Sequence, residues 1–217
     1  MTTTQTSSDA SVRELYDDSA DQYAEMMDRE IDLPIYAELL SRLADGVAEL
    51  EGAVVDTSCG PGHLLSRYRE RYDSERQLVG IDLSARMVAS ARARLGPEVE
   101  VLHGDMRKLE GVETSSSAAV LSFFALHHVT PNEALAALEE WHRILRPGGR
   151  LVLATWEGSG AIDYGGTSEV VALRYTKEQV AGWVRDAGFS ADRCVVEPVE
   201  GLAMNAIYLE GSKGFPA

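Results

Sequence analysis

From residue 52 onward, short apolar runs alternate with longer segments of helical periodicity. This alternation constrains the fold most, because consecutive parallel strands need a crossover connection that is usually a helix. It predicts an α/β fold with a mostly parallel sheet covered by helices on both faces. The predicted strands are Ala53–Thr57, Gln77–Asp82, Val99–His103, Ala118–Phe123, Arg150–Thr155, Arg193–Val196 and Met204–Leu209.

Boundary signals support this alternation. Ser84 is a good N-cap for a helix, and Thr130 and Thr176 each begin a capping box. The run 147–149, Pro-Gly-Gly, is expected to break the chain before the fifth strand. The glycine-rich segment 156–171 is expected to be a loop or a lid.

Residues 1–50 differ in pattern from the rest. The first ten are rich in Thr and Ser and are expected to be frayed, whereas 11–50 have apolar residues at near-helical spacing. We expect one domain over 1–217, with a helical cap over 1–50 and a Rossmann-like core over 51–217.

The chain is acidic, with a formal net charge of −15. Twelve acidic residues against three arginines give the first fifty residues a charge of −9. This charge disfavours a nucleic-acid partner, and an acidic face near an opening could attract an amine or simply be solvated. No apolar run reaches 18 residues, so we expect no membrane span. With no secretory signal pattern and only Cys59 and Cys194, a cytoplasmic location is expected.

The first predicted strand leads into a turn of small residues. Gly60 and Gly62 remove side chains where a ligand could approach the backbone, at the edge where open α/β sheets bind ligands. Asp82 ends the next strand, 22 positions after Gly60. In a βαβ unit that spacing brings a carboxylate beside the turn, where it can accept ribose hydroxyls. The alternative is that Asp82 only caps the following helix.

Two further strand ends add polar and apolar groups. Asp105 could accept an adenine amino group and Met106 could pack on the ring. The fourth strand brings Ser122 and Phe123 to the same edge. This ordered set is harder to explain by turns alone and indicates a nucleoside site.

These residues resemble a known family, the class I S-adenosylmethionine-dependent methyltransferases. The resemblance extends over roughly 12–212, and its first motif is 56–62, Asp-Thr-Ser-Cys-Gly-Pro-Gly. The N-terminal stretch 16–23 is similar to the small-molecule branch that includes ubiquinone and menaquinone methyltransferases. The further motifs of the resemblance are 80–84, 104–106, 125–129 and 145–149.

The resemblance implies a seven-stranded sheet in the order 3-2-1-4-5-7-6 with the last strand antiparallel. It implies S-adenosylmethionine as cofactor, S-adenosylhomocysteine as product, and methyl transfer to an O or N, less often a C, of a small molecule. Asp56 would order the methionine amino group, and Ser58, where the family has its first glycine, could bond the same end of the ligand. The implied cofactor residues are Asp56, Ser58, Gly60, Gly62, Asp82, Leu83, Met87, Asp105, Met106, Ser122 and Phe123.

Two adjacent histidines, His127 and His128, are the candidate catalytic residues. Methyl transfer from a sulfonium is an in-line displacement, so a general base is optional, and histidine suits that role near neutral pH. Adjacent residues rarely face one pocket together, and we favour His127. The alternative is that one histidine hydrogen-bonds a neighbouring helix and the other is partly exposed.

Aromatic residues are candidates for the acceptor pocket. Tyr16 and Tyr23 lie two helical turns apart and could close over the donor, and Trp156 could line the pocket. Tyr164 and Tyr175 are further candidates. Core or surface packing is the alternative for Tyr16 and Tyr23, and burial is the alternative for the other three. No histidine or carboxylate spacing indicates a metal site.

Two other functions remain open. A nicotinamide-dependent oxidoreductase would use the same turn and Asp82, but 60–65 lacks the third glycine of its motif. A protein that binds the cofactor without transferring a methyl group also fits the pattern. The acceptor and the oligomeric state are not predicted.

Overall fold

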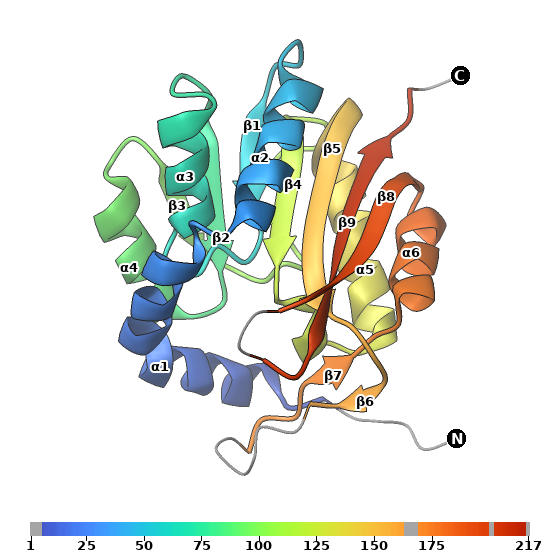
Figure 1. The fold of residues 1–217 in the computed structure, drawn as a ribbon. Coiled ribbons are helices and arrows are strands. Elements are labelled where there is room, and N and C mark those ends of the chain that lie inside the picture. Colours follow the sequence, from blue (N-terminus) through green and yellow to red (C-terminus); the bar gives the residue numbers. More distant parts are fainter. Residues whose placement is uncertain (1–5, 163–168, 200–201, 216–217) are drawn as a thin grey trace.

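The computed structural model describes residues 6–162, 169–199 and 202–215 (Figure 1). Seven strands form one sheet in the order β3-β2-β1-β4-β5-β9-β8, and β9 runs antiparallel to both of its neighbours. The α/β class, the strand order and the antiparallel last strand are therefore confirmed. The strands are β1 Ala53–Asp56, β2 Leu78–Asp82, β3 Glu100–His103, β4 Ser117–Phe123, β5 Leu145–Trp156, β8 Phe189–Pro198 and β9 Asn205–Lys213.

Helices lie on both faces of the sheet (Figure 1). Helices α2, α3 and α4 pack on one face and α5 and α6 on the other, each set closing its own apolar core. Strand β1 shows why both faces need cover, since Val54 and Val55 point to opposite cores and neither is exposed. The helices are α1 Asp9–Glu30, α2 Pro34–Val47, α3 His63–Arg71, α4 Ala85–Leu95, α5 Pro131–Ile144 and α6 Lys177–Asp186, with a short 3₁₀ helix η1 at Leu126–His128.

The expected helix caps are present. The Oγ atom of Ser84 accepts a hydrogen bond from the Met87 backbone N–H at 3.0 Å. Thr130 and Thr176 both form complete capping boxes at the starts of α5 and α6. Gly188 follows α6 with a φ of +95°, a left-handed conformation that glycine adopts without strain.

Strand β5 corrects one prediction. The run 147–149 lies inside β5 and does not precede it, because a register shift between Ser117 and Ala119 of β4 absorbs the extra residues. Part of 156–171 is also regular, since β6 (Gly160–Ala161) pairs with β7 (Leu173–Arg174). Residues 163–168 lie outside the described residues.

Helix α1 runs across the edge of the sheet at which the parallel strands end (Figure 1). It begins at Asp9, within the segment expected to fray, because Ser8 caps it through a 3.2 Å hydrogen bond from the Ser11 N–H. The expected helical cap is thus present as α1 and α2. Among the described residues no helix is long and apolar enough to cross a membrane.

Candidate functional site

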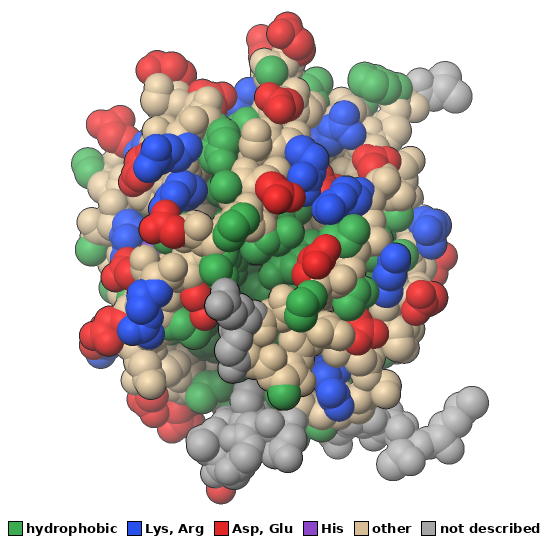
Figure 2. Space-filling view, viewed as in Figure 1, with side chains coloured by type: hydrophobic (Ala, Val, Ile, Leu, Met, Phe, Trp, Pro, Cys, Tyr) green, Lys and Arg blue, Asp and Glu red, His purple; other side chains and the backbone are tan. Residues whose placement is uncertain are grey.

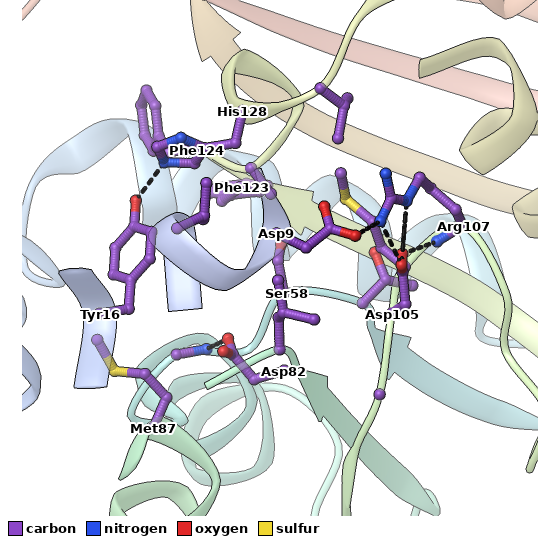
Figure 3. Close-up of a pocket in the computed structure, with 18 of the residues that line it drawn as sticks. Asp9, Tyr16, Ser58, Asp82, Met87, Asp105, Arg107, Phe123, Phe124 and His128 are labelled. Atoms are coloured by element: carbon purple, nitrogen blue, oxygen red, sulfur yellow. Dashed lines mark hydrogen bonds and ion pairs between the residues drawn. The ribbon is translucent and has the colours of Figure 1, made fainter. Parts of the chain in front are cut away.

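A cavity of about 720 Å³, counted out to its open mouth, lies between α1 and the carboxyl ends of β1, β2 and β4 (Figure 3). The loops after these strands and after β3 supply its floor, and the inner side of α1 supplies its roof. Its walls are formed by Asp9, Val12, Tyr16, Tyr23, Thr57, Ser58, Gly60, Asp82, Leu83, Met87, Gly104, Asp105, Met106, Arg107, Phe123, Phe124, Ala125, His128 and Val129.

The glycine turn and Asp82 meet as the spacing predicts. One carboxylate oxygen of Asp82 accepts the Gly60 N–H at 2.8 Å, and the other accepts the Ser84 N–H at 2.9 Å. Burial raises the pKa of Asp82, although these backbone hydrogen bonds oppose the shift. Asp82 therefore braces the next helix start and also faces the cavity, with lone pairs left for a ligand.

Asp56 lies deeper at the end of β1 and is fully buried. Its Oδ1 accepts the Ser58 N–H at 3.2 Å, whereas its Oδ2 has no partner among the described residues. Burial, reinforced by the charge of Asp82, raises the pKa of Asp56 to about 7. A buried carboxyl with an unpaired oxygen is costly unless a ligand completes it.

Ser58 stands in the family's glycine position without strain. Its backbone is not in the left-handed region, whereas Gly60 and Gly62 have φ values of +50° and +86°. The Ser58 hydroxyl lies 3.2 Å from that of Ser122, which is fully buried behind it and does not line the cavity. Gly62 does not line it either and faces α4, where a Cβ would meet Leu95 at 3.0 Å.

Asp105 lines the cavity but already has a partner. The Arg107 guanidinium holds both of its oxygens, at 2.9 and 3.0 Å from Nε, and lowers the pKa of Asp105 against the effect of burial. Arg107 also contacts Asp9 of α1 at 2.6 Å (Figure 3). It contacts Glu133 of α5 at the same distance, 2.6 Å. An adenine amino group would have to share this carboxylate with the arginine.

Apolar residues fill the rest of the predicted set. Leu83, Met87, Met106 and Phe123 all line the cavity. Trp156 does not reach it, but packs on the lining residue Phe124 with ring centroids 4.6 Å apart.

Of the two adjacent histidines, only one lines the cavity. His128 lines the cavity and its Nε2 lies 2.8 Å from the Tyr16 hydroxyl, whereas His127 is buried and is not a lining residue. Burial lowers the pKa of His128 to about 4. Burial also lowers the pKa of His127 well below its ordinary value, and the neighbouring His128 adds to that shift. The position that we expected for His127 is thus held by His128. Tyr23 also lines the cavity.

Two other aromatic candidates differ in outcome. The Tyr175 hydroxyl donates to the Val129 carbonyl and its ring packs on Trp183, so Tyr175 serves the fold. Tyr164 lies outside the described residues. The structure describes no cluster of three or more potential metal ligands in the parts of the chain that it covers.

Eight lining residues were not predicted from the sequence. Phe124 is the most distinctive, since its φ of +52° is rare for a bulky residue and marks a constrained site. Its position directly after Phe123 was an available signal, as was Arg107 two residues after Asp105. The others are Asp9, Val12, Thr57, Gly104, Ala125 and Val129.

Comparisons with known proteins agree with this geometry. Residues 54–149 match a family model described as a methyltransferase domain. The chain is 34% identical over 158 residues to an uncharacterized 37.1 kDa protein in transposon TN4556 of Streptomyces fradiae, covering 66% of this chain and 45% of that protein. It is 31% identical over 144 residues to carboxy-S-adenosyl-L-methionine synthase of Aliivibrio fischeri, covering 62% and 57%. The chain thus spans about half the length of these relatives.

A solved structure matches nearly the whole chain. The 1,6-didemethyltoxoflavin-N1-methyltransferase of Burkholderia thailandensis, solved with 1,6-didemethyltoxoflavin and S-adenosylhomocysteine bound, is similar with a TM-score of 0.73 at 20% identity, covering 95% of this chain and 88% of that one. The chain therefore has the Rossmann-like methyltransferase fold.

Proposed function

We propose that this protein transfers a methyl group from S-adenosylmethionine to a nucleophilic O or N of a small molecule. One observation carries the proposal. Asp82 and the Gly60 turn face one cavity, 2.8 Å apart, with the buried and half-paired Asp56 behind them. The family match covers all three positions.

The residues fit the cofactor group by group. Each oxygen of Asp82 accepts only one backbone N–H, which leaves acceptor capacity for two ribose hydroxyls. The unpaired oxygen of Asp56 suits the ammonium of the methionine portion. Leu83 and Met87 offer apolar contacts to a base.

The cofactor supplies a methyl group on a sulfonium, and the protein's contribution is alignment and exclusion of water. Helix α1 excludes water by covering the cavity. His128 is the residue at the cavity that can take a proton from a nucleophile, with its ring held by Tyr16. A pKa of about 4 makes it a weak base, so alignment carries most of the rate.

The small-molecule class of acceptor rests on enclosure and charge. The cavity is roofed by α1, and a net charge of −15 disfavours a phosphate backbone. The similar protein from Burkholderia thailandensis was solved with 1,6-didemethyltoxoflavin bound, which is consistent with this class.

A second candidate function is cofactor binding with chemistry other than methyl transfer. The 31% identity to carboxy-S-adenosyl-L-methionine synthase is the observation that favours this second function. Incubation with methyl-labelled S-adenosylmethionine and an acceptor panel separates the two. Label in an acceptor supports methyl transfer, whereas label retained on a modified cofactor supports the second function.

The cofactor itself is tested by calorimetry. We expect S-adenosylhomocysteine to bind and NAD not to bind. The reverse result would favour the nicotinamide-dependent alternative and overturn the proposal.

A further inference from the structure

A second cavity, of about 350 Å³ counted out to its open mouth, adjoins the first. Both are lined by Tyr23, Phe123 and Phe124, so a molecule in the second cavity lies directly beside a molecule in the first. Asp82 and Asp105, which we assign to the ribose and the adenine, line the first cavity and are not among the lining residues of the second. The second cavity is therefore space that the nucleoside of the cofactor does not use.

Apolar and aromatic side chains form most of the second cavity. Met27 of α1, Tyr36 of α2 and Leu64 of α3 line it, and the Tyr36 ring stacks on Phe123 with centroids 5.9 Å apart. Among the described residues that line it there is no Lys, Arg, Asp or Glu. A charged group would lose its hydration here without gaining a counter-charge, whereas an aromatic ring packs well against such walls.

Phe124 is held firmly at the boundary of the two cavities. Its ring packs on Trp156 with centroids 4.6 Å apart and meets Tyr208 edge-on at 6.4 Å. Its φ of +52° persists only where surrounding contacts fix the residue. The boundary is thus an aromatic wall with a fixed position, which suits it to orient a planar molecule.

One polar ring in the second cavity has an unused nitrogen. His63 lines the cavity from the start of α3 and is only 4% exposed. Its Nε2 lies 2.8 Å from the carboxylate of Asp28 on α1, whereas its Nδ1 is buried and has no partner among the described residues. A buried nitrogen without a partner destabilises the free protein, and a ligand that bonds it removes that cost.

The neighbours of His63 determine what its Nδ1 can bind. Hydrogen bonds with His63 and Arg94 lower the pKa of Asp28, so this carboxylate is ionised and can only accept. Nε2 of His63 is therefore the nitrogen that donates. Burial lowers the pKa of His63 and favours the neutral ring, in which Nδ1 is then an acceptor. The group that completes Nδ1 must be a donor, either a hydroxyl or an N–H.

We propose that the second cavity binds an uncharged aromatic ring of the methyl acceptor, and that a hydroxyl or N–H on this ring donates to Nδ1 of His63. The acceptor role rests on the proposed function, whereas the binding of such a ring rests on the cavity alone. The atom to be methylated would lie on the side of the ring toward Phe123 and Phe124, which line both cavities. His63 then selects the acceptor and takes no part in the chemical step.

The surrounding surface agrees with an apolar ligand. Figure 2 shows a hollow lined by hydrophobic side chains beside α2, the helix that carries Tyr36. An apolar ring without a donor would fill the cavity but leave Nδ1 unpaired, and an ionised ring would be desolvated without a partner. The walls and the one free acceptor together favour a phenol or an aromatic N–H compound.

The experiment uses three probes of similar shape. 4-Methylphenol carries a donor, 4-fluorotoluene lacks one, and 4-methylbenzoate is charged. Binding to the full chain is measured at pH 7.5 by ligand-observed NMR titration, with and without saturating S-adenosylhomocysteine. We expect 4-methylphenol to bind about fivefold more tightly than 4-fluorotoluene, as one hydrogen bond to a buried acceptor allows, and at least about tenfold more tightly than 4-methylbenzoate.

Two pairs of variants locate the bound probe. His63→Phe keeps a ring but removes the acceptor, and its control is His142→Phe, at a half-buried histidine of α5 that lines neither cavity. Met27→Trp fills the second cavity, and its control is Met26→Trp, at the neighbouring position of α1 that lines neither cavity. A single cooperative thermal transition verifies that each variant is folded.

His63→Phe should abolish the preference for 4-methylphenol over 4-fluorotoluene, and Met27→Trp should weaken binding of both at least about tenfold. Both controls should behave as the wild type. Equal binding of the two probes to the wild type, or equal effects in a variant and its control, contradicts the proposal. Loss of probe binding in the presence of S-adenosylhomocysteine also contradicts it, because the cofactor product would then occupy the second cavity.

Failure of the proposed function is distinguishable. If S-adenosylhomocysteine does not bind the wild-type chain, the methyltransferase proposal fails, while the titrations without it still test the ring site. If S-adenosylhomocysteine binds and 4-methylphenol does not, only the inference about the second cavity fails.

Discussion

The two sides of the cavity treat their carboxylates in opposite ways. On the β1–β2 side, Asp56 is buried and Asp82 half-buried, and both form hydrogen bonds with backbone N–H groups and have raised pKa values. On the β3 side, Asp105 is held by Arg107 and its pKa is lowered. Both sides place an acid at a strand end, so strand position alone does not distinguish them.

The two sides differ in whether the carboxylate already has a cationic partner within the protein. A buried acid that lacks a cationic partner is stabilised when a ligand brings donors to it, whereas a paired acid gains little. The β1–β2 side is therefore suited to hold the ligand. The β3 side is suited to hold the protein together, because Arg107 links Asp105 to Asp9 of α1 and Glu133 of α5.

The largest expected effect follows from Asp82. Asp82→Ala should weaken S-adenosylhomocysteine affinity roughly tenfold to a hundredfold, because ribose hydroxyls would lose a charged acceptor. Asp105→Ala should weaken it by about threefold or less, since that carboxylate is already occupied. Calorimetry on both variants provides the measurement. Equal losses would erase the distinction between the two sides.

The next effect is the pH dependence of affinity. Asp56 must ionise to bind an ammonium, and its pKa of about 7 means that the ionised fraction falls as the medium becomes more acidic. Between pH 7.5 and pH 6, affinity for S-adenosylhomocysteine should fall roughly eightfold. Asp56→Asn should bind weakly and show a flat profile over this range. A wild-type profile that is equally flat contradicts a role for Asp56.

The same residue should affect stability with the opposite sign. The folded pKa of about 7 lies above the unfolded value of 3.8, so the folded state holds the proton more tightly. Stability of the ligand-free protein from this group therefore falls as pH rises from 3.8 to 7 and stays low above 7. Asp56→Asn should raise the melting temperature at pH 8 and change it little at pH 4. Thermal denaturation at the two pH values measures this contrast.

A smaller effect concerns Arg107. Arg107→Gln removes the ion pair with Asp9 that fastens the start of α1, so S-adenosylhomocysteine should dissociate faster, by about fivefold at most for a pair worth up to 1 kcal/mol. Arg86→Gln is the control, because its pair with Asp21 is exposed on both sides. Stopped-flow dissociation rates compare them. Equal rates in the two variants argue against a special role for Arg107.

The smallest effect separates the histidines. His128→Ala should lower single-turnover methyl transfer only about threefold, because a base of pKa about 4 provides little driving force near neutral pH. His127→Ala should leave the rate unchanged and lower the melting temperature, because it opens a hole in a packed region. A large rate loss in His127→Ala would instead support the sequence-based prediction that His127 is the general base.

Much of the fold was predictable, because strand and helix periods and caps such as Ser84 are local signals. The start of β5 was not, because Pro147 and the two glycines after it signal a break while the pairing with β4 overrides it. The start of β5 is set by hydrogen bonds to a strand that is distant in the chain, and the local sequence pattern contains no signal for them.

The residues of the site also differ in whether a local sequence pattern could predict them. Gly60, Asp82 and Asp105 follow strands and were predictable from spacing. The pairing of Arg107 with Asp105, two residues before it, left a local signal that sequence reasoning missed. The contacts of Arg107 with Asp9 and Glu133 could not be predicted, because those residues are distant in the chain. The choice between His127 and His128 also depends on the tertiary structure, because only the folded chain shows which of the two side chains lines the cavity.

Ion pairs hold much of the cavity's roof in place. Helix α1 carries eight acidic and two basic residues, and its ties include Asp9 to Arg107, Asp21 to Arg86 and Asp28 to Arg94. The sheet below is held by apolar packing. Dissolved salt weakens the attraction between exposed charges, with a screening length of about 8 Å at physiological ionic strength. It leaves apolar contacts largely intact. Ionic strength should therefore loosen these ties of α1 more than it loosens the apolar core, so a ligand enclosed below α1 should exchange faster as salt is added while the core stays folded.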